Sequence, residues 1–321
     1  MDNKLRLIIS NVKISKAFGG EELFSKIITE GLSDKFDVTY IGRPFDIKCS
    51  NKVYPFTNFL DKFPIKKGLS RLTKKFPFLI RLFIKKLNLD CDVFISNSNY
   101  DDLIVKNNNI NYKAVIFIKH DPYEKYDGKY PDSLIKNKKY TIFVLNYEDR
   151  DLLKKKYDGN VKILKIGINF DKDKKIFYPK YVDFYKDKSI IFSIGRLNEK
   201  QKRFSLGIEA FSILSKKYKN LIYVIAGAGP DLERYIKLAK SLGIQDKVRF
   251  LGVISNEEKN WFLRNSKVVL QTSEKENQSI VIIEALNSGA ITLSTKNASL
   301  CKYLNNCFLN GFITVVFVFP S

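Results

Sequence analysis

The sequence predicts an α/β protein with two doubly wound parallel sheets. Short apolar runs of strand length alternate with helical or polar stretches, which is typical of a parallel sheet wrapped by helices. The alternation stops at a charged, aromatic stretch, residues 168–188, and then restarts. With 321 residues, of which 45% are hydrophobic, the chain has enough apolar side chains for two cores. We therefore expect an N-terminal domain over residues 1–168 and a C-terminal domain over residues 169–321.

In the first half, each expected strand is an apolar run bounded by polar residues. A helical pattern from Glu21 to Leu32 follows the first run and the pair Gly19-Gly20. The expected strands cover residues 5–10, 36–42, 92–97, 113–120, 140–146 and 161–167.

The second half repeats this order with clearer periodicity. Its expected strands cover residues 189–195, 220–227, 247–252, 267–272 and 290–295. Its expected helices run from Ser205 to Tyr218, from Asp231 to Leu242 and from Asn256 to Asn265. In doubly wound sheets, ligands bind at the carboxyl ends of the strands, so functional residues are expected in the loops that follow them.

One further helix has to be inferred against its composition. The β-branched run from Ile280 to Ile283 usually indicates a strand, but Ser279 is a good N-cap and Gly289 a good residue to follow a helix C-terminus. We therefore predict a helix between them, buried on most sides, with Glu276 in the loop just before it. A helix start offers free N–H groups and a partial positive charge, which suits a bound phosphate.

The totals limit the possible partners and the compartment. Fifty-six Lys and Arg against thirty-four Asp and Glu give a net charge of +22, which attracts anionic lipid, nucleic acid or phosphorylated ligands. No stretch approaches the roughly 20 apolar residues that span a bilayer, and no signal-peptide pattern opens the chain, so we expect a cytoplasmic protein. Four scattered cysteines and one histidine do not form a familiar zinc motif. We therefore interpret the cysteines as reduced thiols that bind no metal.

Two glutamates with seven residues between them carry the most specific signal. The segment E-NQSIVII-E, from Glu276 to Glu284, resembles the paired glutamates of the retaining glycosyltransferases of family 4, which share the two-domain GT-B fold. The resemblance implies two doubly wound domains facing across a cleft. It also implies that Glu276 contacts hydroxyls of the donor sugar and that Glu284 accepts hydrogen bonds from the nucleotide ribose. The alternative reading is a pair of solvated glutamates beside a core helix.

The segment SIGRLNEKQKRFSLGIEAF, residues 193–211, is similar to a second family motif. By resemblance, Arg196 and a lysine bind the donor diphosphate. Counting back from Ile208 favours Lys202, and Lys200 is the second choice. The glycine turn at residues 227–230 resembles another family element, which we interpret mainly as architecture.

In the first domain, Gly19 and Gly20 match the family's flexible glycine pair near the donor phosphates. His120 follows an expected strand and resembles the family's His-Asp pair at the floor of the cleft. A lone histidine is often structural, but this position at the carboxyl end of a strand favours function.

The resemblance implies sugar transfer from a nucleotide diphosphate donor to a glycan or lipid-linked acceptor hydroxyl, with retention at the anomeric carbon. His120 and Glu276 would act at the sugar, while Gly19, Gly20, Arg196, Lys202, Glu284 and the helix start at Ser279 and Ile280 would bind the donor. No metal or other cofactor is expected, because cationic side chains and helix N–H groups can stabilise the leaving diphosphate. Alternatives are a nucleotide-sugar epimerase of the same fold, a truncated inactive relative, and a non-catalytic basic binding module. No nucleic-acid-binding signature accompanies the charge.

Two segments bear on the acceptor and on domain closure. Residues 61–90 hold nine basic and two acidic side chains among apolar ones, a pattern that predicts peripheral binding to an anionic membrane surface or a cationic helix packed on the sheet. After residues 307–315 the chain ends in ITVVFVFPS, where relatives usually continue with helices that cross back to the first domain. Either this last strand closes the second sheet without the crossing helix, or the tail is a truncated remnant.

Overall fold

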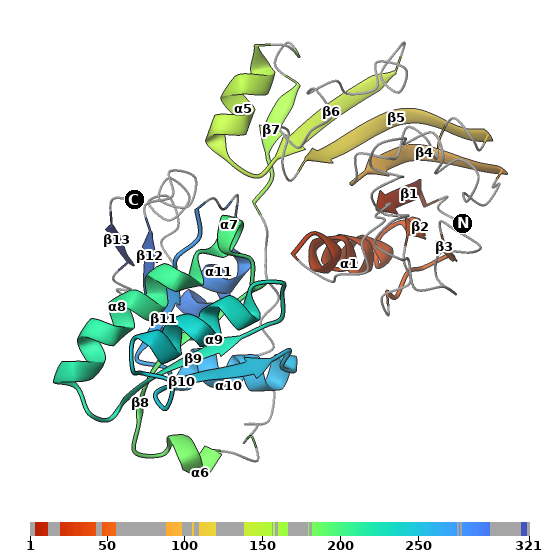
Figure 1. The fold of residues 1–321 in the computed structure, drawn as a ribbon. Helices are drawn as coiled ribbons and strands as arrows, with labels where there is room; N and C mark the ends of the chain where they lie inside the picture. Colours follow the sequence, from red (N-terminus) through yellow and green to blue (C-terminus); the bar gives the residue numbers. More distant parts are fainter. Residues whose placement is uncertain are drawn as a thin grey trace. The chain divides into compact units, whose positions relative to one another are not determined.

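The chain folds into two compact units, Met1–Lys165 and Ile166–Ser321, in a computed structural model. The residues that the structure describes are 4–11, 20–42, 47–55, 88–97, 105, 109–119, 138–155, 157, 160–165, 179, 182–274, 276, 278–295 and 316–319. The basic segment at 61–87 and residues 307–315 lie outside them, so the expectations for those segments stay predictions. Figure 1 labels the helices and strands of the two units.

Within the described residues, the N-terminal unit is built on a seven-stranded sheet with the order β3-β2-β1-β4-β5-β6-β7. All of its strand pairs are parallel. Its strands are β1 (Arg6–Asn11), β2 (Asp37–Gly42), β3 (Val53–Pro55), β4 (Asn88–Ser96), β5 (Asn109–Lys119), β6 (Lys139–Val144) and β7 (Val161–Ile163). Helix α1 (Gly20–Ser33) follows β1 as predicted, and α5 (Tyr147–Lys154) follows β6.

Strands β4 and β5 begin earlier than the apolar pattern indicates. Their first residues are polar and pair across the sheet, where Asn111 Nδ2 donates to Asp90 Oδ1 at 2.9 Å and Lys113 contacts Asp92 at 2.8 Å. At these starts polar residues alternate with buried ones such as Ile110 and Cys91, so the continuous apolar run that marks each strand begins only further along.

The C-terminal unit has, in its described part, a six-stranded parallel sheet with the order β10-β9-β8-β11-β12-β13. Its strands are β8 (Ser189–Ile194), β9 (Leu221–Ala226), β10 (Val248–Gly252), β11 (Val268–Gln271), β12 (Ile291–Thr295) and β13 (Val316–Phe319). Its helices are α6 (Val182–Tyr185), α7 (Glu199–Lys202), α8 (Phe204–Lys217), α9 (Leu232–Ser241), α10 (Asn256–Asn265) and α11 (Ile280–Asn287). The predicted α/β class with two parallel sheets is confirmed.

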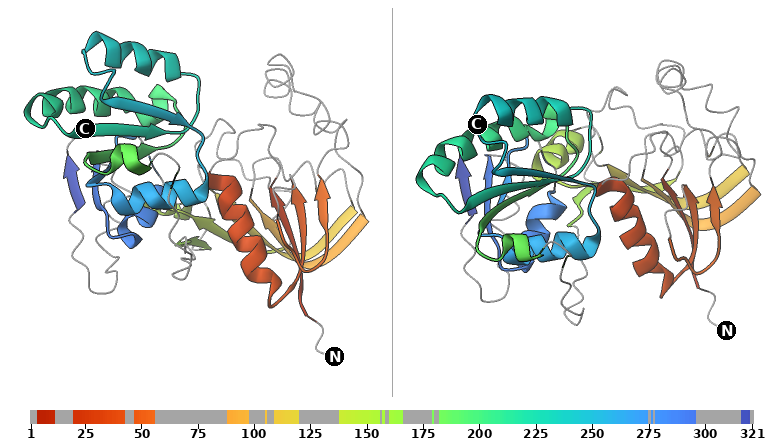
Figure 2. Two further views of the ribbon diagram at one scale, coloured as in Figure 1. Left: turned by 90° about the horizontal axis from the view of Figure 1, so that it is seen from below. Right: turned by 60° about the horizontal axis from the view of Figure 1, so that its bottom comes forward.

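Helices cover both faces of the C-terminal sheet, as a doubly wound fold requires (Figure 2). On one face, Phe204 and Phe211 of α8 and Tyr235 of α9 pack on side chains of β9. On the other face, Phe262 of α10 stacks on Phe192 of β8 with ring centroids 5.0 Å apart. Burial of these aromatic side chains supplies much of the stabilisation of this unit.

The β-branched run at the start of α11 is helical, as the caps predict. The Ser279 side chain accepts a hydrogen bond from the Ile282 backbone N–H, and Gly289 after the helix has φ of 77°, where glycine is favoured. Ile282, Ala285 and Leu286 are buried, so packing on the sheet outweighs the β preference of the sequence. Among the described residues, no helix is both long and apolar enough to span a bilayer.

Candidate functional site

The candidate site lies where the C-terminal sheet reverses its strand order. The chain runs outward from β8 through β9 to β10, then returns to add β11 on the other side of β8. Strands β8 and β11 are therefore neighbours, paired at Val268 with Ile191. In doubly wound sheets the crevice at such a reversal is the usual ligand site. The loops after these two strands carry Arg196 with Lys202 and Glu276.

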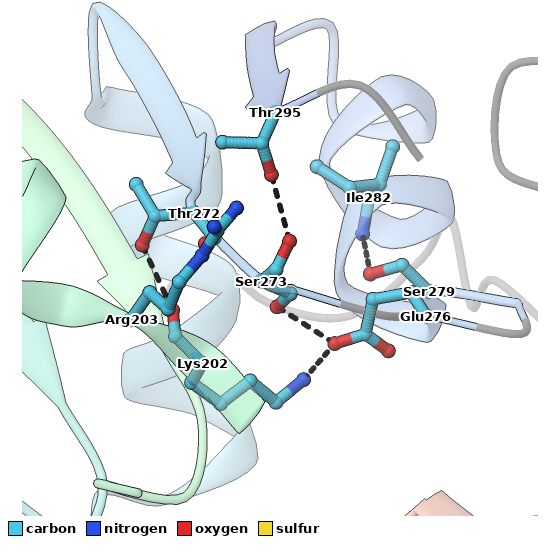
Figure 3. Close-up of polar contacts among 8 residues, drawn as sticks. All are labelled: Lys202, Arg203, Thr272, Ser273, Glu276, Ser279, Ile282 and Thr295. Carbon is cyan, nitrogen blue, oxygen red and sulfur yellow. Dashed lines mark hydrogen bonds and ion pairs between the residues drawn. The ribbon is translucent and has the colours of Figure 1, made fainter. Parts of the chain in front are cut away.

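Lys202 and Glu276 meet at this edge of the sheet (Figure 3). The Lys202 ammonium forms an ion pair with Glu276 Oε1, and the Ser273 hydroxyl donates to the same oxygen at 2.8 Å. The two charged side chains are 17% and 13% exposed, so water screens their attraction only in part. Oε2 of Glu276 accepts no hydrogen bond within the described part of the chain, and a ligand hydroxyl can bind to it.

Four contacts join α7 to the loop after β11, and we call them the α7 bridge. The Thr272 hydroxyl donates to the Lys202 carbonyl at 2.9 Å, and the Glu274 N–H donates to the Gln201 carbonyl at 2.9 Å. Arg203 Nε donates to the Thr272 carbonyl at 3.2 Å, and Arg203 also forms an ion pair with Glu274. Arg203 has φ of 45°, a left-handed conformation that costs energy for a side chain of this size. The α7 bridge therefore holds Lys202 and Glu276 together, and does so at the cost of backbone strain.

Loss of one bridge contact is expected to destabilise the C-terminal unit. Thr272→Val keeps the shape of the buried side chain but leaves the Lys202 carbonyl without that donor, so we expect a loss of about 1–2 kcal/mol. Urea denaturation followed by the fluorescence of Trp261, the single tryptophan of the chain, measures it in this unit.

Thr292→Val is the matched control. The Thr292 hydroxyl on β12 is fully buried and makes no hydrogen bond with the residues that the structure describes, so its removal is expected to be neutral or stabilising. Equal destabilisation by the two substitutions would show that the bridge hydrogen bond contributes nothing.

The glycine turn at residues 227–230 supports the loop after β8. Gly227 has φ of +122°, and a Cβ there would lie 1.9 Å from the Gly195 carbonyl oxygen. A Cβ on Gly229 would lie 2.2 Å from the Leu197 carbonyl oxygen. The Leu197 N–H donates to the Ala228 carbonyl at 3.0 Å across this contact. Both glycines let the two backbones touch, which agrees with the architectural interpretation.

Glu284 is the fifth residue of α11, and Lys259 of α10 contacts it. Lys259 Nζ is 2.6 Å from Glu284 Oε1, with side-chain exposures of 14% and 10%. The first turn of α11 lies between Glu276 and Glu284 in the sequence and presents its early N–H groups at the carboxyl end of β11.

For the other predicted site residues that it describes, the structure gives a position in the fold but no contact with the Lys202–Glu276 pair. Arg196 directly follows the loop glycine after β8 and is exposed, and Lys200 on α7 is exposed too. Gly20 is the first residue of α1. Gly19 and His120 lie outside the described residues. In the described part of the chain, no cluster of three His, Cys, Asp or Glu side chains is found that could hold a metal ion.

The structure adds residues that the sequence did not indicate. Arg203, Thr272 and Ser273 organise the Lys202–Glu276 pair, and Lys259 contacts Glu284. Arg203 adjoins Lys202 in a basic run, which was the only sequence signal for it. Lys259 follows two glutamates in the first turns of a helix, where a lysine is normally solvated.

Comparison with known proteins supports the same interpretation. Residues 174–317 match the family model for glycosyl transferases group 1. An uncharacterized glycosyltransferase of Haemophilus influenzae is 24% identical over 304 residues, which cover 92% of this chain and 82% of that protein.

The fold of the chain is that of the GT-B glycosyltransferase structures. Another relative of this GT-B chain, an uncharacterized glycosyltransferase of Methanocaldococcus jannaschii, is 27% identical over 58% of the chain, which spans 48% of that relative's length. The crystal structure of Anabaena Alr3699/HepE in complex with UDP and glucose matches the GT-B chain with a TM-score of 0.64. It has 16% identity over 98% of this chain and 86% of that one, which shows the fold.

Proposed function

We propose that the chain is a retaining, metal-independent glycosyltransferase that moves a sugar from a nucleotide diphosphate sugar to an acceptor hydroxyl on a glycan or lipid-linked molecule. The observation that supports this most directly is the meeting of Lys202 with Glu276 at the reversal point of the C-terminal sheet. A cation and a carboxylate with a free oxygen at one edge suit a ligand that carries both phosphate and sugar hydroxyls.

The site residues divide between the two parts of the donor. Lys202, Arg196 and the N-terminus of α11 would bind the diphosphate and stabilise its growing charge as the sugar leaves. Donor phosphate would then take the Lys202 ammonium from Glu276, or share it. Glu276 would accept from the sugar hydroxyls, while Glu284 would accept from the ribose.

The remaining steps follow from the resemblance to family members. His120 would contact the donor sugar near the reacting carbon. We propose that no protein nucleophile takes part, and that the departing phosphate oxygen assists the acceptor on the same face of the sugar. The chemistry then needs no metal, because side-chain cations and N–H groups neutralise the leaving group. We also propose that the basic segment at 61–90 binds an anionic membrane surface, where it would bring the protein to a lipid-linked acceptor.

A ligand panel tests the donor part of this proposal. The protein is melted in the presence of ADP, CDP, GDP or UDP, and of the glucose conjugate of each. We expect the ligands with at least one of these bases to raise the Tm of the protein. A ligand at 100 times its Kd stabilises the folded state by about 2.7 kcal/mol. No shift with any of these ligands at millimolar concentration would contradict the proposal.

The reaction is tested with the donor that the panel selects. Slow transfer to water should release a sugar whose first-formed anomer, read by NMR, keeps the donor configuration, and EDTA should not change the rate. Release of the inverted anomer would exclude retention, and conversion of the donor to an isomer without release would favour the epimerase.

A further inference from the structure

Lys259 occupies an unusual position for a lysine. Its side chain is 14% exposed and its ammonium contacts Glu284 Oε1 at 2.6 Å, from one helix to the next. Lysine is rarely so buried unless it is paired. Removing two charges from water costs several kcal/mol, which close contact only partly offsets. Packing alone does not account for this pair.

The Lys259 side chain makes no hydrogen bond or ion pair with the residues of its own helix, all of which the structure describes. Glu258 belongs to the capping box of α10, where its carboxylate accepts from the Ser255 N–H at 2.8 Å and Ser255 caps the Glu258 N–H at 3.1 Å. Glu257 is exposed on the first turn. The lysine instead spans to α11.

The contact leaves half of the Glu284 carboxylate available. An ionised carboxylate offers about four acceptor positions on two oxygens, and Lys259 occupies one of them on Oε1. Within the described residues, Oε2 of Glu284 accepts no hydrogen bond. Glu276 shows the same arrangement, with Oε1 held by Lys202 and Ser273. Each of the two glutamates thus has one oxygen held by a lysine and the other open to a ligand.

We propose that Lys259 is a positioning residue that fixes the Glu284 carboxylate, so that its second oxygen selects a ribose over a 2′-deoxyribose in the bound nucleotide. This rests on the proposed function, which gives Glu284 a ribose to bind. Fixing one oxygen restricts the rotation of the carboxylate, and a preorganised acceptor loses less entropy when the hydroxyls bind. A site built to accept from a hydroxyl discriminates against the analogue that lacks it, because the buried oxygen is then left unpaired.

Paired ligands test the role of Lys259. Calorimetry gives Kd for ADP, CDP, GDP and UDP and for their 2′-deoxy counterparts with wild type, Lys259→Met and Lys259→Gln. For the base that binds, the wild type should prefer the ribonucleotide by about 10- to 100-fold, because a hydrogen bond to a charged group contributes roughly that much. Lys259→Met should lose most of this preference by weakening ribonucleotide binding, while the Kd of the 2′-deoxy form changes less than about threefold. Lys259→Gln removes the charge but keeps a hydrogen-bond donor that can contact Glu284. We therefore expect its preference for ribose over 2′-deoxyribose to lie between those of the wild type and Lys259→Met.

Lys247→Met is the matched control, because Lys247 is a half-buried lysine of the same unit that donates to the Ser215 carbonyl at 3.0 Å. Its preference for ribose should equal that of the wild type.

A lower Tm for the Lys259 variants with an unchanged preference would mean that Lys259 only stabilises the helix pair, and would overturn the inference. If Lys259→Met does not fold, Lys259→Gln decides by the same ratio. Failure of the wild type to bind any of the diphosphates would overturn the proposed function itself. Binding without any preference for ribose would overturn only the role given to Glu284 and Lys259.

Discussion

Lys202→Met is expected to lower kcat/KM for transfer of the donor sugar to water by about 100-fold, and to weaken nucleoside diphosphate binding. Removing one preorganised donor from a developing charge typically costs 10²- to 10³-fold in rate, and methionine keeps the apolar stem while losing the ammonium. Release of nucleoside diphosphate from the selected donor gives the rate, and calorimetry gives the affinity.

Lys200→Met is the control that the chain itself offers. Lys200 lies two residues away on α7, is exposed, and was the alternative candidate from the sequence. We expect its kcat/KM to stay within about twofold of the wild type, because exposed charges are screened by water. A larger loss from Lys200→Met than from Lys202→Met would reverse the assignment of the diphosphate ligand.

Gly227→Ala is expected to destabilise the C-terminal unit by about 3–5 kcal/mol. The new Cβ would lie 1.9 Å from the Gly195 carbonyl oxygen, and the residue would have to keep φ of +122°. Backbone strain and overpacking each cost about 1–3 kcal/mol, and here both act on backbone atoms that cannot rotate away. Urea denaturation read by Trp261 fluorescence measures the loss.

Gly243→Ala separates the two causes. Gly243 has φ of +69°, but nothing lies within 4 Å of an added Cβ, so only the conformational cost of about 1–2 kcal/mol applies. If the two variants were equally stable, close backbone contact at Gly227 would have no part in holding the loop after β8. Nucleoside diphosphate binding should fall in Gly227→Ala alone, since that loop carries Arg196.

Strands β8 and β9 at the centre of the C-terminal sheet were predictable from sequence because they are buried along most of their length. Phe192 and Val224 sit in continuous apolar runs, and good caps mark α10 and α11. The short strand β3 was not predicted, because three residues carry too little periodicity. The starts of β4 and β5 were missed because polar residues that pair across the two strands interrupt the apolar run there.

The candidate site was predictable only for residues that share a motif. Glu276 and Glu284 are identified by their spacing, and the structure brings Lys202 to Glu276. Lys259 is distant in sequence from Glu284, and no local pattern distinguishes a lysine that spans two helices from one in solvent. The left-handed conformation of Arg203 is also invisible in the sequence, because the α7 bridge imposes it from segments far along the chain.

The neighbouring position of β8 and β11 makes the order of folding matter. Lys202 and Glu276 are 74 residues apart, and the intervening chain must form β9 and β10 and pass back across the sheet before the two can touch. Closing so long a segment is slow, and a chain that stalls there has the lysine without its carboxylate. On the proposed function, a nucleotide present during refolding would bind only to molecules that have completed this crossover, so the rate of binding would report when the crossover forms.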